Sequence, residues 1–220
     1  MNPNYTAVSR PRLGALEANK VLKNTYLLLS ATLAFSAVMA MLSMAINVPP
    51  VAYIISIIAS MVLGIFVLPK AANSSAGVGV IFLITGLLGF GLGSIISIYM
   101  AMANGPQIVA TAFGGTGIIF LGLSGYALTS KKDFSCLGGF LFAGMMVVVL
   151  AIIASLFIQM PALSLTISAA VIMLMSGFIL FDTSRIINGG ETNYIMATYG
   201  IFLSIFNIFI SLLNILGIMG

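Results

Sequence analysis

Long, continuous apolar runs are separated by short polar segments along the whole chain. The runs lack the period-two alternation of membrane β-strands, and each approaches the ~20 residues that a helix needs to cross ~30 Å of hydrocarbon. Lipid admits only helices and closed barrels, so the pattern predicts an all-α, polytopic membrane protein. We expect a bundle of seven transmembrane helices, at Thr25–Ile46, Val51–Leu68, Gly77–Met102, Ile108–Thr129, Leu137–Ile158, Leu163–Phe181 and Ile195–Met219.

The breaks between the runs carry turn or charge signals, such as NVPP at 47–50, NGPQ at 104–107 and SRIINGGETNY at 184–194. We interpret the last run as the least apolar of the seven. Six full spans followed by a half-inserted segment is therefore an alternative to seven spans.

The positions of the basic residues predict the orientation of the bundle. All eight fall in the N-terminal segment or in the second, fourth and sixth connections, and none lies in the first, third or fifth. The positive-inside rule then places the N-terminus in the cytoplasm, with residues 1–24 as a polar tail and 25–219 as the transmembrane domain. The net charge of +4 is thus a topology signal, and we expect no nucleic-acid partner. The basic residues are Arg10, Arg12, Lys20, Lys23, Lys70, Lys131, Lys132 and Arg185.

The composition agrees with a lipid-embedded chain and excludes several chemistries. Hydrophobic residues make up 61% of the 220 residues and charged residues 5%, whereas soluble domains carry ~25% charged residues. The absence of histidine excludes histidine-based catalysis and a histidine-ligated zinc site. Cys136 is the single cysteine, so no internal disulfide is expected. The sequence contains no P-loop and no metal-spaced cluster, and we expect no cofactor or metal centre.

Two features resemble intramembrane proteases but lack the partners that the chemistry needs. The GLSG stretch at 122–125 resembles the serine motif of rhomboid-type proteases, yet no base lies nearby to activate Ser124. Aspartyl proteases need two facing aspartates, and Asp182 is the one acid at the edge of a span. The sequence therefore predicts no catalytic residues and no enzyme.

Small residues gather in the third and fourth spans. Gly89 and Gly93 form a small-xxx-small pair in the third span, and the fourth contains FGGTG and GLSG. Glycines allow close approach of helix backbones in lipid. We expect tight packing of spans three and four in the bundle centre, with a gating hinge as the alternative.

A polar stripe follows one face of the last span. Ser204, Asn207, Ser211 and Asn214 lie at i, i+3, i+7 and i+10, one turn after Gly200. Polar side chains in lipid need partners, so this face should point to the bundle interior. The stripe either forms hydrogen bonds between helices or lines a polar cavity.

Asp182 ends a long apolar run, and two interpretations of this carboxylate remain open. It could pair with Arg185 one turn later, just before Gly189 and Gly190 end the helix. It could instead face the polar stripe of the last span, where a carboxylate could sense pH or contact a cation.

Four motifs identify a family resemblance. KVLKNTYLLLSATLAFSA, KKDFSCLGGFLFAG, QMPALSLTISA and FDTSRIINGGETNYI resemble the bacterial YccA-like branch of the Bax inhibitor-1 family, over Lys20 to Gly217. The resemblance implies a seven-helix bundle in the bacterial inner membrane. It also implies one of two activities. Some members modulate the membrane AAA protease FtsH and are its slow substrates, whereas others are pH-dependent calcium leaks controlled by two aspartates.

The resemblance assigns a pH or cation site residue by residue. Asp182 matches the first aspartate of the family and Asn207 its asparagine in the last helix, but Ser204 stands where the second aspartate is expected. The partner arginine of the second span has no counterpart in Val51–Leu68. A calcium site would lose half of its charged oxygens, so the sequence favours the protease modulator. The polar residues before Thr25 would then give an ATP-driven protease a terminus to pull.

Overall fold

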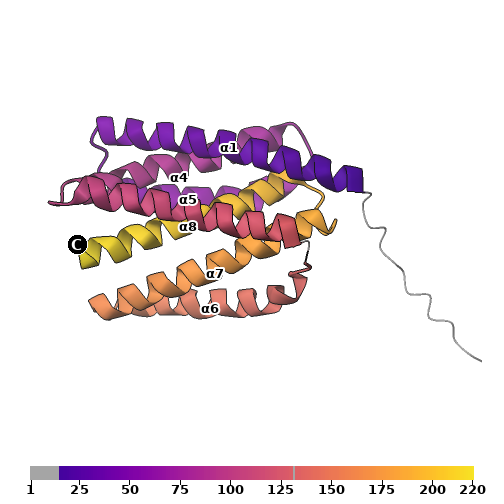
Figure 1. Cartoon of the computed structure of the whole chain (residues 1–220). Helices are drawn as coiled ribbons and strands as arrows, with labels where there is room; N and C mark the ends of the chain where they lie inside the picture. The colour runs from indigo at the N-terminus through magenta and orange to yellow at the C-terminus, as the bar shows by residue number, and fades with distance from the viewer. Residues whose placement is uncertain (1–14, 131) are drawn as a thin grey trace, which may run out of the picture.

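The computed structural model describes residues 15–130 and 132–220, and helices form nearly all of this part of the chain. No strand occurs among these residues. The helices lie side by side along one direction (Figure 1). They are α1 (Ala15–Ala45), α2 (Val51–Val62), the π-helical η1 (Leu63–Val67), α3 (Leu68–Ala71), α4 (Ala76–Met100), α5 (Gly105–Ser130), the 3₁₀ turn η2 (Ser135–Leu137), α6 (Gly138–Ser155), α7 (Pro161–Ile187) and α8 (Tyr194–Met219).

Seven helical segments of the described chain are long and apolar enough to cross a membrane, with α2, η1 and α3 forming one of them. The predicted all-α polytopic architecture is therefore confirmed. The expectation that the last span is the least apolar is wrong, because the most apolar stretch of α8 is more apolar than that of α5. With 26 residues, α8 is also long enough to cross a membrane. Its serines and asparagines are outweighed by the isoleucines, leucines and phenylalanines between them.

The first helix begins ten residues before the predicted start of the first span, at Ala15 rather than Thr25. Residues 15–24 include strong helix formers such as Ala, Leu, Glu and Lys. Glu17 lies in the first turn, where a negative charge favours the helix dipole, and Ala18 is buried. The last part of the predicted tail is thus a helical extension of α1, and residues 1–14 lie outside the described part.

The described basic residues lie at one end of the bundle. The start of α1 and the connections α3–α4, α5–α6 and α7–α8 share this end (Figure 1). Lys20, Lys23, Lys70, Lys132 and Arg185 belong to these segments, whereas Arg10, Arg12 and Lys131 fall outside the described residues. We call this the basic end. Its assignment to the cytoplasm stays a prediction.

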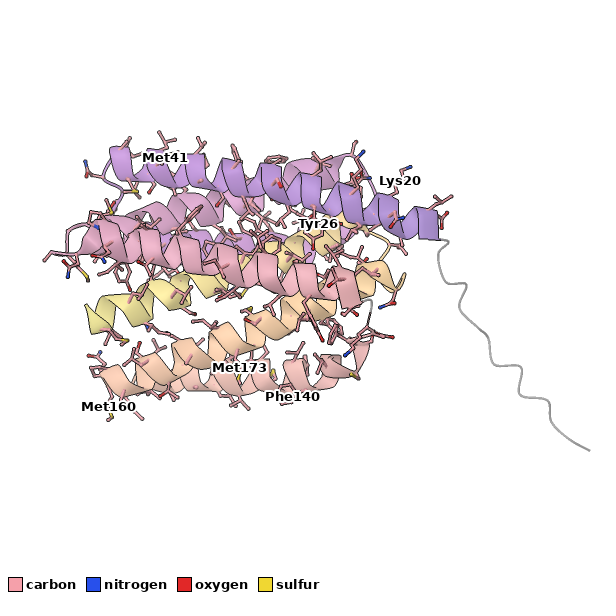
Figure 2. All side chains as sticks on the ribbon, in the orientation of Figure 1. Lys20, Tyr26, Met41, Phe140, Met160 and Met173 are labelled. Carbon is pink, nitrogen blue, oxygen red and sulfur yellow. The ribbon has the colours of Figure 1, made fainter. Side chains whose placement is uncertain are left out.

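The last helix occupies the middle of the bundle. α8 packs against α7, α5, α1 and α4, and α6 lies at the outer edge against α7 (Figure 1). Phe202, Ile201, Ile208 and Leu213 of α8 are almost completely buried. By contrast, Met41, Phe140, Met160 and Met173 project from the outside of the bundle, where each is more than half exposed (Figure 2). Such an apolar exterior is stable in lipid and would be costly in water.

Four glycines of α4 pack closely, as expected for the third span, and their neighbours are α1 and α2: Gly86, Gly89, Gly91 and Gly93. A Cβ on Gly89 would collide with the backbone carbonyl of Ser36, and one on Gly93 with the carbonyl of Ala40. A Cβ on Gly91 would lie 2.7 Å from the side-chain Cβ of Ser56 in α2. In α5, a Cβ on Gly114 or Gly122 would meet nothing within 4 Å. Small residues favour close packing, but they do not specify which neighbour approaches.

Candidate functional site

The end of α7 is set by two glycines, as the sequence predicts. Gly189 has a φ of 73°, a left-handed conformation that glycine adopts without steric cost. The N–H of Gly190 donates to the carbonyl of Arg185 at 2.7 Å, and that of Gly189 donates to Ile186 at 3.2 Å. These two bonds form a Schellman motif. The motif turns the chain back toward the last turn of α7.

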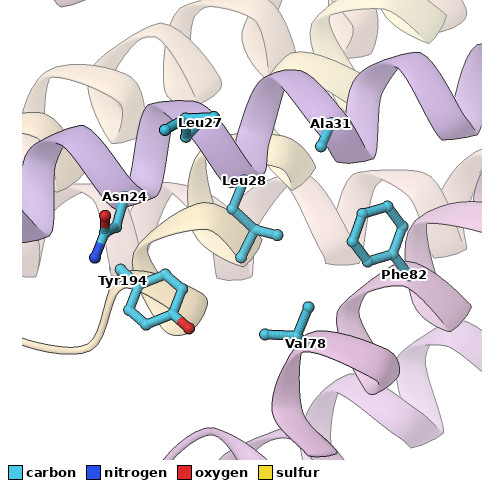
Figure 3. Close-up of a pocket in the computed structure, with 7 residues that line it drawn as sticks. All are labelled: Asn24, Leu27, Leu28, Ala31, Val78, Phe82 and Tyr194. Atoms are coloured by element: carbon cyan, nitrogen blue, oxygen red, sulfur yellow. The ribbon is translucent and has the colours of Figure 1, made fainter. Parts of the chain in front are cut away.

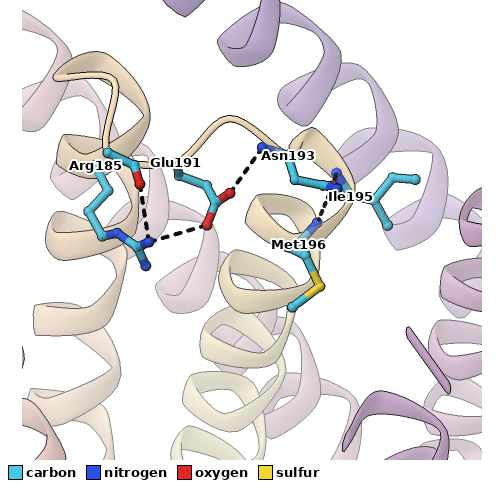
Figure 4. A network of polar contacts seen from close by, with 6 residues as sticks. Arg185, Glu191, Asn193, Ile195 and Met196 are labelled. Carbon is cyan, nitrogen blue, oxygen red and sulfur yellow. Dashed lines mark hydrogen bonds and ion pairs between the residues drawn. The ribbon is translucent and has the colours of Figure 1, made fainter. Parts of the chain in front are cut away.

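This turn gives Arg185 a partner other than Asp182. Its Nη2 lies 3.4 Å from Glu191 Oε2 and donates to the carbonyl of Gly190 at 3.3 Å (Figure 4). The guanidinium also lies over the Phe181 ring, 5.4 Å from the centroid. The first of the two open interpretations, an ion pair between Asp182 and Arg185, is therefore not found among the described residues. The reversal of the backbone brings Glu191 beside Arg185, which helical spacing alone could not indicate.

Asp182 instead faces α8. A Cβ built on Gly200 would lie 2.7 Å from Asp182 Oδ2, so the carboxylate occupies the space that the missing side chain leaves. Within the described residues, Asp182 forms no hydrogen bond and no ion pair within 4 Å. The structure therefore agrees with the interpretation that turns this carboxylate toward the last helix.

Ser204 and Asn207 lie on the same face of α8 but bond to their own helix. The buried Ser204 hydroxyl donates to the carbonyl of Gly200 at 3.1 Å, and Asn207 Nδ2 donates to that of Leu203 at 2.8 Å. These local bonds satisfy the polar groups without a partner helix. Of the four predicted site residues, Asp182 and Ser204 thus both adjoin Gly200. Arg185 is directed to the α7–α8 connection.

The far end of the polar stripe joins two helices. Asn214 Nδ2 donates to Ser164 Oγ at 2.7 Å and to Ser168 Oγ at 2.8 Å, both in α7. The interpretation of the stripe as interhelical hydrogen bonding is confirmed for Asn214. Such bonds hold α7 and α8 together where lipid provides no hydrophobic drive between helices.

Sequence reasoning missed Asn193, which connects three segments at the basic end. Its Oδ1 accepts from the N–H groups of Ile195 at 2.9 Å and Met196 at 3.2 Å, so Asn193 caps α8 (Figure 4). Its Nδ2 donates to the carbonyl of Ala72 at 3.0 Å and to Asn73 Oδ1 at 2.9 Å, across the α3–α4 connection.

The same network includes Glu191, whose Oε1 accepts from the N–H of Asn193 at 2.9 Å. An asparagine directly before an apolar run is a recognisable N-cap signal. Its bonds to the α3–α4 connection have no local signal, because they depend on how the helices pack. Glu191 and Asn193 thus tie the end of α7 to the start of α8 and to the α3–α4 connection.

The site offers a carboxylate but no metal centre. No group of three or more His, Cys, Asp or Glu residues in the described ranges is placed to hold a metal ion. Asp182 can exchange a proton or attract a cation, with Gly200 as its neighbour on α8. This arrangement supports protonation or weak ion contact at Asp182.

Comparisons with known proteins place this architecture among described relatives. A family model with the description "Inhibitor of apoptosis-promoting Bax1" matches residues 18–220. An uncharacterized membrane protein of Vibrio cholerae is 52% identical over 93% of this chain and 92% of its own length. The modulator of FtsH protease YccA of Escherichia coli is 47% identical over 95% and 94%, respectively. An uncharacterized protein of Pseudomonas aeruginosa is 45% identical over 93% and 91%.

Proposed function

The chain belongs to the Bax inhibitor-1 family, and from this membership we propose that it modulates a membrane AAA protease of the FtsH type and is its slow substrate. It is a YccA-like, multi-pass inner-membrane protein. The observation that carries the proposal is the 47% identity, across nearly the whole of both chains, to the protein named as a modulator of FtsH protease.

Slow extraction of α1 is the physical basis of the proposed inhibition. The N-terminal residues lead directly into α1, which lies against the glycine face of α4. Thr198 Oγ1 of α8 also donates to the buried carbonyl of Thr25 at 3.2 Å. A protease that pulls from the N-terminus must separate both contacts before the chain moves. The protease would therefore remain bound to a substrate that it extracts slowly, and it would be unable to degrade others in that time.

Deleting residues 2–14 is expected to slow degradation of the protein by at least several-fold and to relieve inhibition of the protease. The deletion ends before Ala15 and leaves α1 whole. Both quantities can be measured with purified protease and protein in proteoliposomes, using a second membrane substrate to report inhibition.

A variant with residues 2–14 in scrambled order is the matched control, because it keeps length, composition and the charges of Arg10 and Arg12. Its degradation should resemble that of the wild type if the protease needs only a polar terminus to pull. Unchanged degradation and unchanged inhibition after the deletion would exclude the N-terminal segment as the point of engagement.

A pH-sensitive calcium or cation leak is the second candidate function, and the position of Asp182 against Gly200 favours it. This carboxylate forms no ion pair within 4 Å in the described chain and faces the central helix. A Ser204→Asp change would add a second acid one turn from Gly200. Two carboxylates provide more of the charged oxygens that calcium prefers.

Calcium flux into liposomes distinguishes this candidate from the first. Flux should fall as Asp182 is protonated at low pH, since the site then loses its negative charge. Asp182→Asn should therefore give low flux that no longer changes with pH, and Ser204→Asp should raise flux at high pH several-fold. Glu17→Gln removes a charge at an exposed position of α1 and is the control. Wild-type flux that is absent, or equal in Asp182→Asn, rules out the leak.

A further inference from the structure

An open groove runs between α1 and α4 near the basic end, with a volume of about 400 Å³. Figure 3 shows Asn24 beside Tyr194 at one end, then Leu28 and Val78, and Phe82 at the other end. Leu27 and Ala31 complete the wall formed by α1. The groove is thus formed by three helices, because Tyr194 is the first residue of α8.

The groove is polar at one end and apolar at the other. Asn24 has no hydrogen-bond partner among the described residues, and the Tyr194 ring beside it points its hydroxyl toward Val78. Beyond them the wall is aliphatic. Phe82 closes the far end, where its ring packs edge-on against Phe35 with centroids 5.5 Å apart.

One basic residue and one helix N-terminus lie near the polar end of the groove. Lys20 is exposed (Figure 2) and lies four residues before Asn24, a spacing that puts both residues on the same face of α1. Val78, in the first turn of α4, lines the groove, and the N-cap Ser75 forms no side-chain bond to the helix. The N–H groups at a helix N-terminus favour an anion, and phosphate in particular. A lysine and a helix N-terminus therefore lie close to the same polar end.

We propose that this groove binds one anionic phospholipid from the leaflet at the basic end. The phosphate lies near Lys20, Asn24 and the start of α4, and one acyl chain lies along Leu28 and Val78 as far as Phe82. α1 rises ~10 Å from Asn24 to Ala31, a length that suits the upper part of an acyl chain. The groove is open on the outside of the bundle, where lipid is the surrounding solvent.

An anionic phospholipid fits this groove better than a helix of another protein would. A charged headgroup matches the lysine and the helix N-terminus at one end, and the aliphatic wall begins where the headgroup ends. Basic residues near a membrane surface attract anionic lipid, each with about a fivefold effect on affinity. The site thus couples α1, the proposed first helix to be extracted, to the lipid around it.

Native mass spectrometry of the full chain with phosphatidylglycerol tests the proposal. Ala31→Phe fills the groove and should lower lipid retention at least tenfold, whereas Ala37→Phe adds the same side chain at an exposed position of α1 outside the groove and should not. Equal retention by the two variants overturns the site. A circular dichroism spectrum of each variant shows whether it is folded.

The headgroup is tested separately by comparing phosphatidylglycerol with phosphatidylcholine. Lys20→Gln should reduce the preference for phosphatidylglycerol about fivefold, and Lys132→Gln, at the α5–α6 connection, should leave it unchanged. Loss of preference in both variants indicates general surface attraction and overturns the proposal, as does a wild type that retains both lipids equally. Dimers that persist without lipid, and are lost in Ala31→Phe, would assign the groove to a second copy of the chain.

Discussion

Replacing Gly89 by leucine is expected to lower the midpoint of thermal unfolding by about 10 °C and to make the protein a faster protease substrate. The new Cβ would collide with the carbonyl of Ser36 and lie 2.6 Å from its Oγ. Overpacking costs ~3 kcal/mol, and each kcal/mol moves the midpoint by ~2–4 °C for a chain of this length. The obstacle is backbone, so α1 must move away from α4 as a whole.

Gly122→Leu in α5 is the matched control, because a Cβ there would meet nothing within 4 Å. It adds the same side chain to a membrane helix, and its midpoint should stay within ~2 °C of the wild type. Circular dichroism in detergent measures the midpoints, and the proteoliposome assay measures degradation. Equal midpoints for the two variants would show that the close approach of α1 and α4 does not limit stability. A destabilised Gly89→Leu that is degraded no faster would separate bundle stability from protease resistance.

Asn193→Ala is expected to cost ~2–3 kcal/mol, the second largest effect. The change removes the N-cap of α8, worth ~1 kcal/mol, and the hydrogen bonds to Ala72 and Asn73, worth ~1 kcal/mol each. The change also removes the link between the α7–α8 connection and the α3–α4 connection. The midpoint should therefore fall by roughly 5–10 °C, and amide hydrogen exchange should increase in the first turn of α8.

Asn73→Ala isolates one of these bonds and should cost ~1 kcal/mol. In the double variant, Asn73→Ala should add almost nothing to Asn193→Ala, because the two residues share that bond. If the losses of stability of the two single variants add in the double variant, the Asn193–Asn73 hydrogen bond contributes nothing to stability. A loss for Asn193→Ala no larger than that for Asn73→Ala would show that the cap of α8 is not needed.

The number and approximate limits of the helices could be predicted because each depends on a local property. The length of each apolar run matches the thickness of the membrane, so it predicts a span. Gly189 and Gly190 are typical of a helix C-terminus, so they predict where α7 ends. The start of α1 could not be read in this way. Its first turns are amphipathic, and composition alone assigned them to a polar tail.

The partners of the charged and small residues depended on packing that the sequence does not encode locally. Arg185 had Asp182 one turn away, yet the Schellman turn gave it Glu191. Gly89 and Gly93 indicated a close helix contact but not that α1 would make it. The position of Asp182 against α8 was one of two alternatives, and the space at Gly200 decided between them.

The helix that fills the middle of the bundle follows the other described helices in the order of synthesis. Until α8 emerges, Ser164 and Ser168 lack the amide of Asn214, and Asp182 lacks the surface of Gly200. Since chains insert from the N-terminus onward, the bundle lacks its central helix during most of its biogenesis. A product truncated before Tyr194 would be a helix bundle without its central helix. The polar side chains of α7 that face α8 would then be exposed to lipid. Packing of the 26 residues of α8 thus completes the assembly of these helices.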